Sequence, residues 1–229
     1  MTKPERLDMT TEIDTIAQRV ATLHAESVTR LPGEVLAAFS AEQALLDEAG
    51  IPAGVLPAGS AMPDGELLDV HGNPTTLTEA RRGKPAVVVT YRGAWCPYCN
   101  VALHAYQEQL VPVLADRGIE LIAISPQKPD GSLTMAEKNE LTFTVLSDPG
   151  NRIARGLGVL TASTEAARTA QQTLGLDLTQ VNADATHDVP MPTAVLVDAT
   201  GVIRWIDVHP NYTTRTESAD IITALDLLA

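Results

Sequence analysis

The stretch VVVTYRGAWCPYCN, residues 87–100, decides the fold. Its first half belongs to the apolar, β-branched run 86–91, which is typical of a strand buried on both faces. Its second half opens a helix over 97–117, because Pro97 suits the first helical position, where its missing N–H would have no partner anyway. Cys96 is then expected at the N-cap, and Cys99 lies one turn inside the helix.

The cysteine pair lies where a strand gives way to a helix, and this placement favours redox chemistry. Unpaired N–H groups and the positive end of the helix dipole stabilise a thiolate, and Arg92 close by in the sequence favours the charged sulfur further. Such a pair can attack a disulfide or a peroxide and then close on itself. We interpret Cys96 and Cys99 as catalytic. We expect Cys96 to attack first, because the N-cap is the more exposed position.

Two other interpretations of the pair are weaker. A structural zinc site needs two further ligands, but the chain has no other cysteine. Its histidines are scattered along the sequence, at His24, His71, His104, His187 and His209. An inert buried pair is disfavoured because a strand-to-helix turn in a βαβ unit is where redox motifs occur. We therefore expect no metal and no other cofactor.

The rest of the chain predicts an α/β fold. The helix should kink at Pro112, and a second strand over 120–125 makes 86–125 a right-handed βαβ unit. Further patterns predict a helix over 132–140, a strand over 143–146, a helix over 164–174, a hairpin of strands 193–197 and 202–208, and a last helix from Thr216. This order is that of a thioredoxin-like fold, with a central mixed sheet flanked by helices.

Residues 1–60 are predicted to form a helical extension, and residues 61–229 the thioredoxin-like domain. Apolar residues recur at helical spacing behind Thr10 and Thr11, and again before Gly50. They are Ile13, Ile16, Val20 and Leu23, then Val35, Leu36, Phe39, Leu45 and Leu46. Such stripes pack on a core or on a second subunit, so a homodimer is one expectation.

The charge of the chain narrows its partners. With 16 basic and 29 acidic side chains the net charge is −13, and an acidic surface repels both nucleic acid and anionic lipid. The first ten residues, MTKPERLDMT, lack the apolar segment of a secretory signal. No apolar run approaches the roughly 20 residues of a membrane helix. We expect a cytoplasmic protein that acts on small molecules or on other proteins.

A second constellation is VPMPT, residues 189–193, which leads directly into a predicted strand. In a thioredoxin-like fold this turn lies against the cysteine pair and offers a backbone edge to an extended substrate. Met191 and Pro192 are therefore expected on the substrate side. A proline at strand entry can take the cis form, and the fold context favours a cis bond before Pro192.

The residues beside the cysteines complete the expected site. Trp95 is interpreted as an apolar lid next to the sulfurs. Tyr98 faces either the substrate or the solvent, because a tyrosine suits both settings. Together with Arg92 and Pro97, these residues form the substrate-side or activating group.

These segments resemble the peroxiredoxin-like branch of the alkyl hydroperoxide reductase/thiol-specific antioxidant (AhpC/TSA) family. The resemblance runs from about residue 60 to the end, and it is carried by VVVTYRGAWCPYCN (87–100), LIAISPQ (121–127), VLSD (145–148), PMPTAVLVDATGVIRW (190–205) and NYTTRTE (211–217). It implies an enzyme that cycles Cys96 and Cys99 between dithiol and disulfide. Such an enzyme reduces hydroperoxides with electrons from a thioredoxin-like or low-molecular-weight thiol.

Two alternative functions stay open: a protein disulfide oxidoreductase without significant peroxidase activity, and a non-catalytic redox sensor or binding module. Tyr212 and Arg215 lie in the NYTTRTE segment, just before the last predicted helix. We interpret both as loop anchors, and the alternative is that they form the rim of the active site.

The two kinds of site known in this fold assign the cysteines differently. Peroxiredoxins carry a Pro, Thr and Cys signature with a distant Arg. In that register Cys99 falls at the peroxide-attacking cysteine, Cys96 at the threonine, Arg92 at the proline and Pro192 at the arginine. In the register of a thioredoxin site, Cys96 attacks and Cys99 resolves. The sequence leaves both assignments open.

Overall fold

A mixed sheet of seven strands forms the centre of the computed structural model, which describes residues 14–228. The strand order is β2-β1-β5-β4-β3-β8-β9, with β3, β4 and β5 parallel and the other neighbours antiparallel. The strands are β1 Glu66–Leu68, β2 Pro74–Thr76, β3 Ala86–Thr90, β4 Glu120–Ser125, β5 Thr144–Ser147, β8 Thr193–Val197 and β9 Ile203–Val208. A separate ribbon pairs β6 Leu160–Ala162 with β7 Asp188–Pro190.

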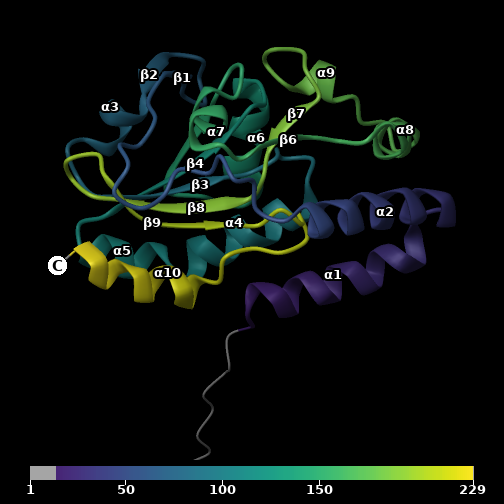
Figure 1. The fold of residues 1–229 in the computed structure, drawn as a ribbon, viewed down its shortest axis with the longest axis horizontal. Helices are drawn as coiled ribbons and strands as arrows, with labels where there is room; N and C mark the ends of the chain where they lie inside the picture. The colour runs from purple at the N-terminus through teal and green to yellow at the C-terminus, as the bar shows by residue number, and fades with distance from the viewer. Residues whose placement is uncertain (1–13, 229) are drawn as a thin grey trace, which may run out of the picture.

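Helices cover both faces of the sheet (Figure 1). Side chains of β3 and β4 alternate between two apolar cores, so both strands are buried on both faces. One core takes in α4, α5 and α10, and the other takes in α3 and α7. The helices are α3 Leu77–Arg81, α4 Pro97–Gln109, α5 Val111–Asp116, α6 Pro129–Lys138, α7 Arg152–Leu157, and α10 Ser218–Ala224 with the 3-10 turn η1 Leu225–Leu228. The predicted fold class is confirmed.

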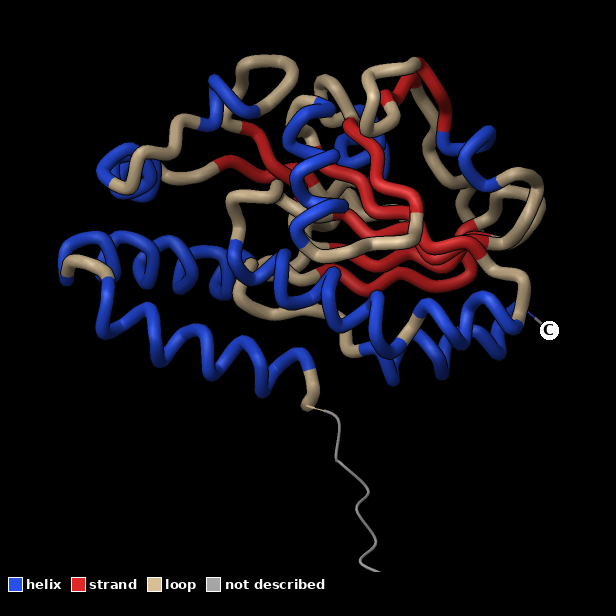
Figure 2. The backbone as a smooth tube through the Cα atoms, turned by 180° about the vertical axis from the view of Figure 1, so that it is seen from behind, coloured by secondary structure: helices blue, strands red, loops and turns tan. Residues whose placement is uncertain are grey.

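The N-terminal extension is a hairpin of two helices beside the sheet (Figures 1 and 2). It consists of α1 Ile16–Arg30, which packs on α4, and α2 Gly33–Ala49, which packs on α8 Glu165–Thr173. Glu217, just before α10, caps α1 by accepting the N–H groups of Ile16 and Ala17 at 2.9 and 2.8 Å. The buried Glu42 of α2 accepts the N–H of Thr164 at 2.8 Å. Both helices of the extension are therefore fastened to the domain.

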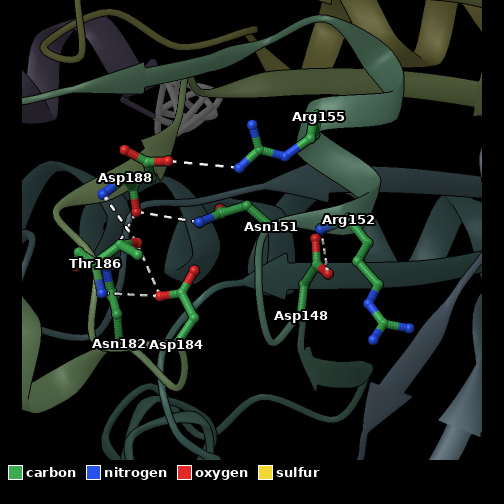
Figure 3. A network of polar contacts seen from close by, with 8 residues as sticks. All are labelled: Asp148, Asn151, Arg152, Arg155, Asn182, Asp184, Thr186 and Asp188. Carbon is green, nitrogen blue, oxygen red and sulfur yellow. Dashed lines mark hydrogen bonds and ion pairs between the residues drawn. The ribbon is translucent and has the colours of Figure 1, made fainter.

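A network of polar contacts fixes the approach to β7 and β8 (Figure 3). Asn182 follows the short helix α9, Leu178–Val181, and its amide donates to the carbonyls of Thr186 and Asp188, each at 3.0 Å. The amide of Asn151 donates to the Asp188 carbonyl as well, at 3.2 Å. In this irregular segment, side-chain amides therefore satisfy backbone carbonyls that have no partner in a regular strand or helix. The chain that enters β8 beside the cysteines consequently has a fixed path.

Several helix boundaries differ from those predicted, and each difference has a local cause. The helix predicted over 97–117 is divided into α4 and α5 at Leu110, because Pro112 has no N–H to donate. The helix predicted from residue 132 begins at Pro129, which suits the first turn. The last helix begins at Ser218 rather than at Thr216, whose hydroxyl is bound to Asp207 at 2.8 Å.

The start of the extension is also shifted. The predicted caps Thr10 and Thr11, with Ile13, lie outside the described residues. Helix α1 begins after Thr15, which forms a capping box with Gln18. Over residues 14–228, no helix has both the length and the apolar character that crossing a bilayer would require.

Gly158 allows a close approach between the domain and the connector that follows the extension. Its φ is +78°, and a Cβ placed on it would lie 2.2 Å from the carbonyl oxygen of Gly54. We expect Gly158→Ala to lower the free energy of unfolding by about 2 kcal/mol or more, as measured by urea denaturation. Gly118→Ala is the matched control, because Gly118 also has positive φ but open space around it. Its loss should be about 1 kcal/mol, and equal losses would contradict the role of the contact.

Candidate active site

Cys96 and Cys99 lie at the N-terminus of α4, as predicted. Cys96 is the N-cap, Pro97 is the first helical residue, and the N–H of Cys99 donates to the Cys96 carbonyl at 3.1 Å. Both cysteines are free and buried, with no disulfide between them. Since α4 directly follows β3 and a short loop, the sheet and the helix dipole together fix where the two sulfurs lie.

Hydrogen bonds hold the backbone of the loop that precedes the cysteines. The N–H of Ala94 donates to the Gln127 side chain at 2.8 Å, and the Asn100 side chain donates to the carbonyls of Ala94 and Cys96, both at 2.9 Å. Gly93 has a φ of +149°, and a Cβ there would lie 2.3 Å from the Trp95 indole nitrogen. Only glycine therefore fits between the strand and this indole ring.

Arg215 brings a positive charge onto the sulfurs from the far end of the chain. Its Nη2 lies 3.0 Å from Cys99 Sγ and 3.9 Å from Cys96 Sγ. Its other terminal nitrogen donates to the carbonyls of Tyr212 and Thr214, so the loop before α10 holds the guanidinium in place. A guanidinium in this position stabilises a thiolate and can bind the oxygen atoms of an approaching peroxide.

Arg92 supplies a second positive charge, which contacts two aromatic rings. Its guanidinium lies over both rings, 3.9 Å from the centre of the Tyr212 ring and 5.0 Å from that of the Trp95 ring. Its Nη2 donates to the Ser163 hydroxyl at 3.4 Å, and its backbone N–H donates to Cys99 Sγ at 3.5 Å. Arg92 thus acts on Cys99 through both its backbone N–H and its charge.

The two thiols differ strongly in acidity. Burial by itself raises the pKa of Cys99, but the Cys96 thiol, the Arg215 charge and the Arg92 N–H together lower it to about 5. Burial raises the pKa of Cys96, and its hydrogen bond to Cys99 raises it further. Burial lowers the pKa of Arg215, but the adjacent Cys99 thiolate more than offsets this and raises it. At neutral pH the site therefore holds one thiolate, on Cys99, and one thiol, on Cys96.

This asymmetry predicts a pH profile. Because the pKa of Cys99 is lowered, its thiolate is complete above about pH 6 and is lost as the pH falls through about 5. We expect the thiolate absorbance at 240 nm, taken as reduced minus disulfide protein, to show this midpoint. Cys99→Ser should remove the transition. A single midpoint near the ordinary cysteine value of about 8.5 would contradict the assignment.

Pro192 lines the small cavity beside Cys99, whereas the Met191 side chain packs in the other apolar core, and two predictions about these residues are wrong. No peptide bond within residues 14–228 is cis, so the bond before Pro192 is trans, the form that most X–Pro bonds prefer. Met191 does not offer a free backbone edge. Its N–H donates to Val159 at 2.8 Å, and its carbonyl accepts the hydroxyls of Thr90 and Thr193 at 2.7 and 2.9 Å. The backbone edge at Met191 is therefore already hydrogen-bonded, next to the pairing of β6 with β7.

The exposure expected of the N-cap is not observed. Cys96 is 1% exposed and Cys99 0% exposed, so accessibility does not favour Cys96 as the attacking residue. Tyr98 is half-buried and its ring lies 6.3 Å from that of Tyr212. Trp95 is also half-buried beside the pair, and Pro97 is exposed. Within the described part of the chain, no three His, Cys, Asp or Glu side chains gather as a metal would require.

Arg215 and Tyr212 are the functional residues that the sequence interpretation placed in a lesser role. Arg215 does anchor its loop, but it also contacts both sulfurs, so the active-site alternative is the correct one. The available signal was the family-like segment NYTTRTE, which holds an arginine just before a helix.

A thioredoxin-like fold with two free cysteines at a helix N-terminus defines a thiol-redox protein. The family model described as "AhpC/TSA family" matches residues 58–206, which is more than half of the chain. The protein therefore belongs to the AhpC/TSA family, and the resemblance stated from the sequence is confirmed.

Named relatives agree with this assignment. The chain is 37% identical over 101 residues to peroxiredoxin Q, chloroplastic, of Gentiana triflora, covering 44% of this chain and 46% of that protein. It is 32% identical over 104 residues to peroxiredoxin Bcp of Escherichia coli (strain K12), covering 45% and 65%. The chain thus spans about half to two thirds of the length of such curated relatives.

Solved structures show the same fold. Peroxidoxin BcpB from Mycobacterium tuberculosis superimposes with a TM-score of 0.57 at 19% identity, over 76% of this chain and 96% of that one. Reduced Prx3 in complex with H2O2 from Vibrio vulnificus superimposes with a TM-score of 0.59 at 17% identity, over 74% and 99%. In both cases most of the other chain is covered, whereas about a quarter of this chain has no counterpart in the superposition.

Proposed function

We propose that the protein is a thiol-dependent peroxidase in which Cys99 attacks the hydroperoxide and Cys96 resolves the product. The observation that carries this proposal is the contact of the Arg215 guanidinium with Cys99 Sγ at 3.0 Å. This contact supports a peroxidase because the same group that lowers the pKa of the thiol can hold and polarise a peroxide oxygen. In the peroxiredoxin register the distant arginine falls at Pro192, which has no charge. Arg215, from another part of the chain, can take the place of that arginine.

The proposed reaction has three steps. The Cys99 thiolate attacks the terminal oxygen of the hydroperoxide, so that an S–O bond forms and the O–O bond breaks. The alcohol leaves with a proton taken from solvent, and Cys99 becomes a sulfenic acid. The Cys96 thiol then attacks the Cys99 sulfur, water leaves, and a disulfide remains. Two equivalents of an external thiol restore the dithiol and form one external disulfide.

The small space beside Cys99 suits a small peroxide group. A cavity of about 10 Å³ beside Cys99 is lined by Tyr106, Pro192 and Arg215, among others. This volume is close to what one water-sized group occupies.

A cytoplasmic location, a homodimer and a domain boundary near residue 60 remain predictions.

The test is single-turnover oxidation of the reduced protein. Mixing with hydrogen peroxide in a stopped-flow instrument should change the intrinsic tryptophan fluorescence, because Trp95 lies beside the cysteines. The second-order rate constant should exceed that of free cysteine by about 100-fold or more. The matched control is protein alkylated with iodoacetamide. Oxidation no faster than free cysteine, together with rapid reduction of insulin disulfides, would instead favour the disulfide oxidoreductase.

A further inference from the structure

A large cavity lies between the N-terminal extension and the cysteine pair. Its volume is about 580 Å³, and it is lined by residues of α1, α2, the active-site loop and residues 171–176. Residues of α1 and α2 form one wall of this cavity, and Leu174, Gly175 and Leu176, just after α8, line it as well. This wall belongs to the part of the chain that precedes the family match at residues 58–206.

The two sulfurs face different spaces. Cys96 lines the large cavity, together with Trp95, Pro97 and Tyr98, whereas Cys99 lines only the small cavity beside Arg215. In the disulfide state a thiol bound in the large cavity can therefore reach the Cys96 sulfur but not the Cys99 sulfur. Attack at Cys96 also releases the better leaving group, because Arg215 and the Arg92 N–H stabilise the Cys99 thiolate.

The shape and lining of the cavity indicate what kind of thiol fits. Its volume lies within the range of small-molecule sites, about 300–1,000 Å³. The walls are mostly apolar, with Leu23, Leu36 and Phe39 from the extension and Leu174 and Leu176 opposite. Apolar walls favour a ligand that has apolar surface to bury.

The depth of the site argues against a large partner. Cys96 is 1% exposed and lies behind the extension, and this extension is fastened by the Glu217 cap on α1 and by the bond from Thr164 to Glu42. A cysteine on the surface of a folded partner would have to enter the cavity or displace α1 and α2. A small thiol needs neither movement.

We propose that this cavity binds the reductant, and that the reductant is a low-molecular-weight thiol with an apolar body. The inference rests on the proposed function, since it concerns the disulfide that the peroxidase reaction forms. The first thiolate attacks the Cys96 sulfur, forming a mixed disulfide and releasing the Cys99 thiolate. A second molecule of the external thiol, as its thiolate, attacks the sulfur of the first external thiol in the mixed disulfide. The external disulfide leaves, and Cys96 takes up a proton.

The test measures reduction alone and avoids peroxide. The protein disulfide is prepared with diamide, and its reduction by benzyl mercaptan and by 2-mercaptoethanol is followed by intrinsic tryptophan fluorescence. Both rates are divided by the rates of the same thiols with cystine, which removes their intrinsic reactivity. We expect a corrected preference for benzyl mercaptan of about tenfold or more, with a rate that saturates as the thiol fills the site.

Variants of the cavity lining test whether the preference for benzyl mercaptan depends on the cavity. Phe39→Ala and Leu174→Glu change opposite walls, and each should lower the preference by at least threefold. Leu45→Ala is the control, since Leu45 lies on the same helix as Phe39, is 55% exposed and does not line the cavity. The inference is overturned if the corrected rates are equal, if the wall variants behave like Leu45→Ala, or if a thioredoxin reduces the disulfide faster than benzyl mercaptan at equal concentration. None of these outcomes bears on oxidation by peroxide, which decides the proposed function separately.

Discussion

Replacing Arg215 with leucine should slow the reaction of the reduced protein with hydrogen peroxide by about 100-fold at pH 7. The guanidinium lies 3.0 Å from Cys99 Sγ, and burial of this sulfur raises its pKa once the positive charge is gone. The raised pKa leaves less of Cys99 as thiolate at pH 7, and this accounts for part of the loss. Loss of the contact to the peroxide oxygens adds to this effect. Stopped-flow oxidation at several pH values measures both contributions.

The pH profile separates the two contributions. At pH 9.5 the thiolate is largely restored in Arg215→Leu, so the remaining deficit reports binding of the peroxide. Arg215→Lys keeps a charge but loses the planar fork of donors, and it should recover the thiolate more fully than the peroxide contact. Arg117→Leu, at the exposed end of α5, is the matched loss of charge and should leave the rate unchanged. An Arg215→Leu protein with the wild-type rate at pH 7 contradicts the proposed role.

The sequence was sufficient for the framework of this site because the signals are local. The apolar run before Cys96 specifies a strand buried on both faces, and Pro97 specifies the first helical turn, so the cysteines are placed by residues within one βα unit. The interruption of the helix at Pro112 is equally local. Each of these predictions depends on neighbours in sequence, and each is confirmed.

Arg215 could not be predicted in the same way because its contact joins residues 116 positions apart. It depends on the return of the chain through β9 and on the loop before α10, whose carbonyls hold the guanidinium. The burial of Cys96 is likewise tertiary, because it results from packing rather than from the N-cap position. Local patterns therefore specify where the sulfurs lie, whereas the long-range contacts decide which sulfur is ionised.

This division between the sulfurs leads to the largest expected effect. Cys99→Ser should abolish rapid oxidation by peroxide, with a loss of about 1,000-fold or more, because the remaining Cys96 thiol is buried and burial raises its pKa. Cys96→Ser should keep the first step, since the serine hydroxyl can still donate a hydrogen bond to the Cys99 thiolate. It should then stop at a sulfenic acid, which dimedone traps and mass spectrometry locates on Cys99.

Cys96→Ala provides the matched comparison, because it removes the resolving thiol and the hydrogen bond together. Its Cys99 should have a higher pKa than in Cys96→Ser and should react more slowly at pH 6, while both variants accumulate the same sulfenic acid. Circular dichroism and urea denaturation of all three variants establish that they remain folded. Dimedone labelling on Cys96 in the Cys99→Ser protein, at the wild-type rate, would reverse the assignment and make the N-cap cysteine the nucleophile.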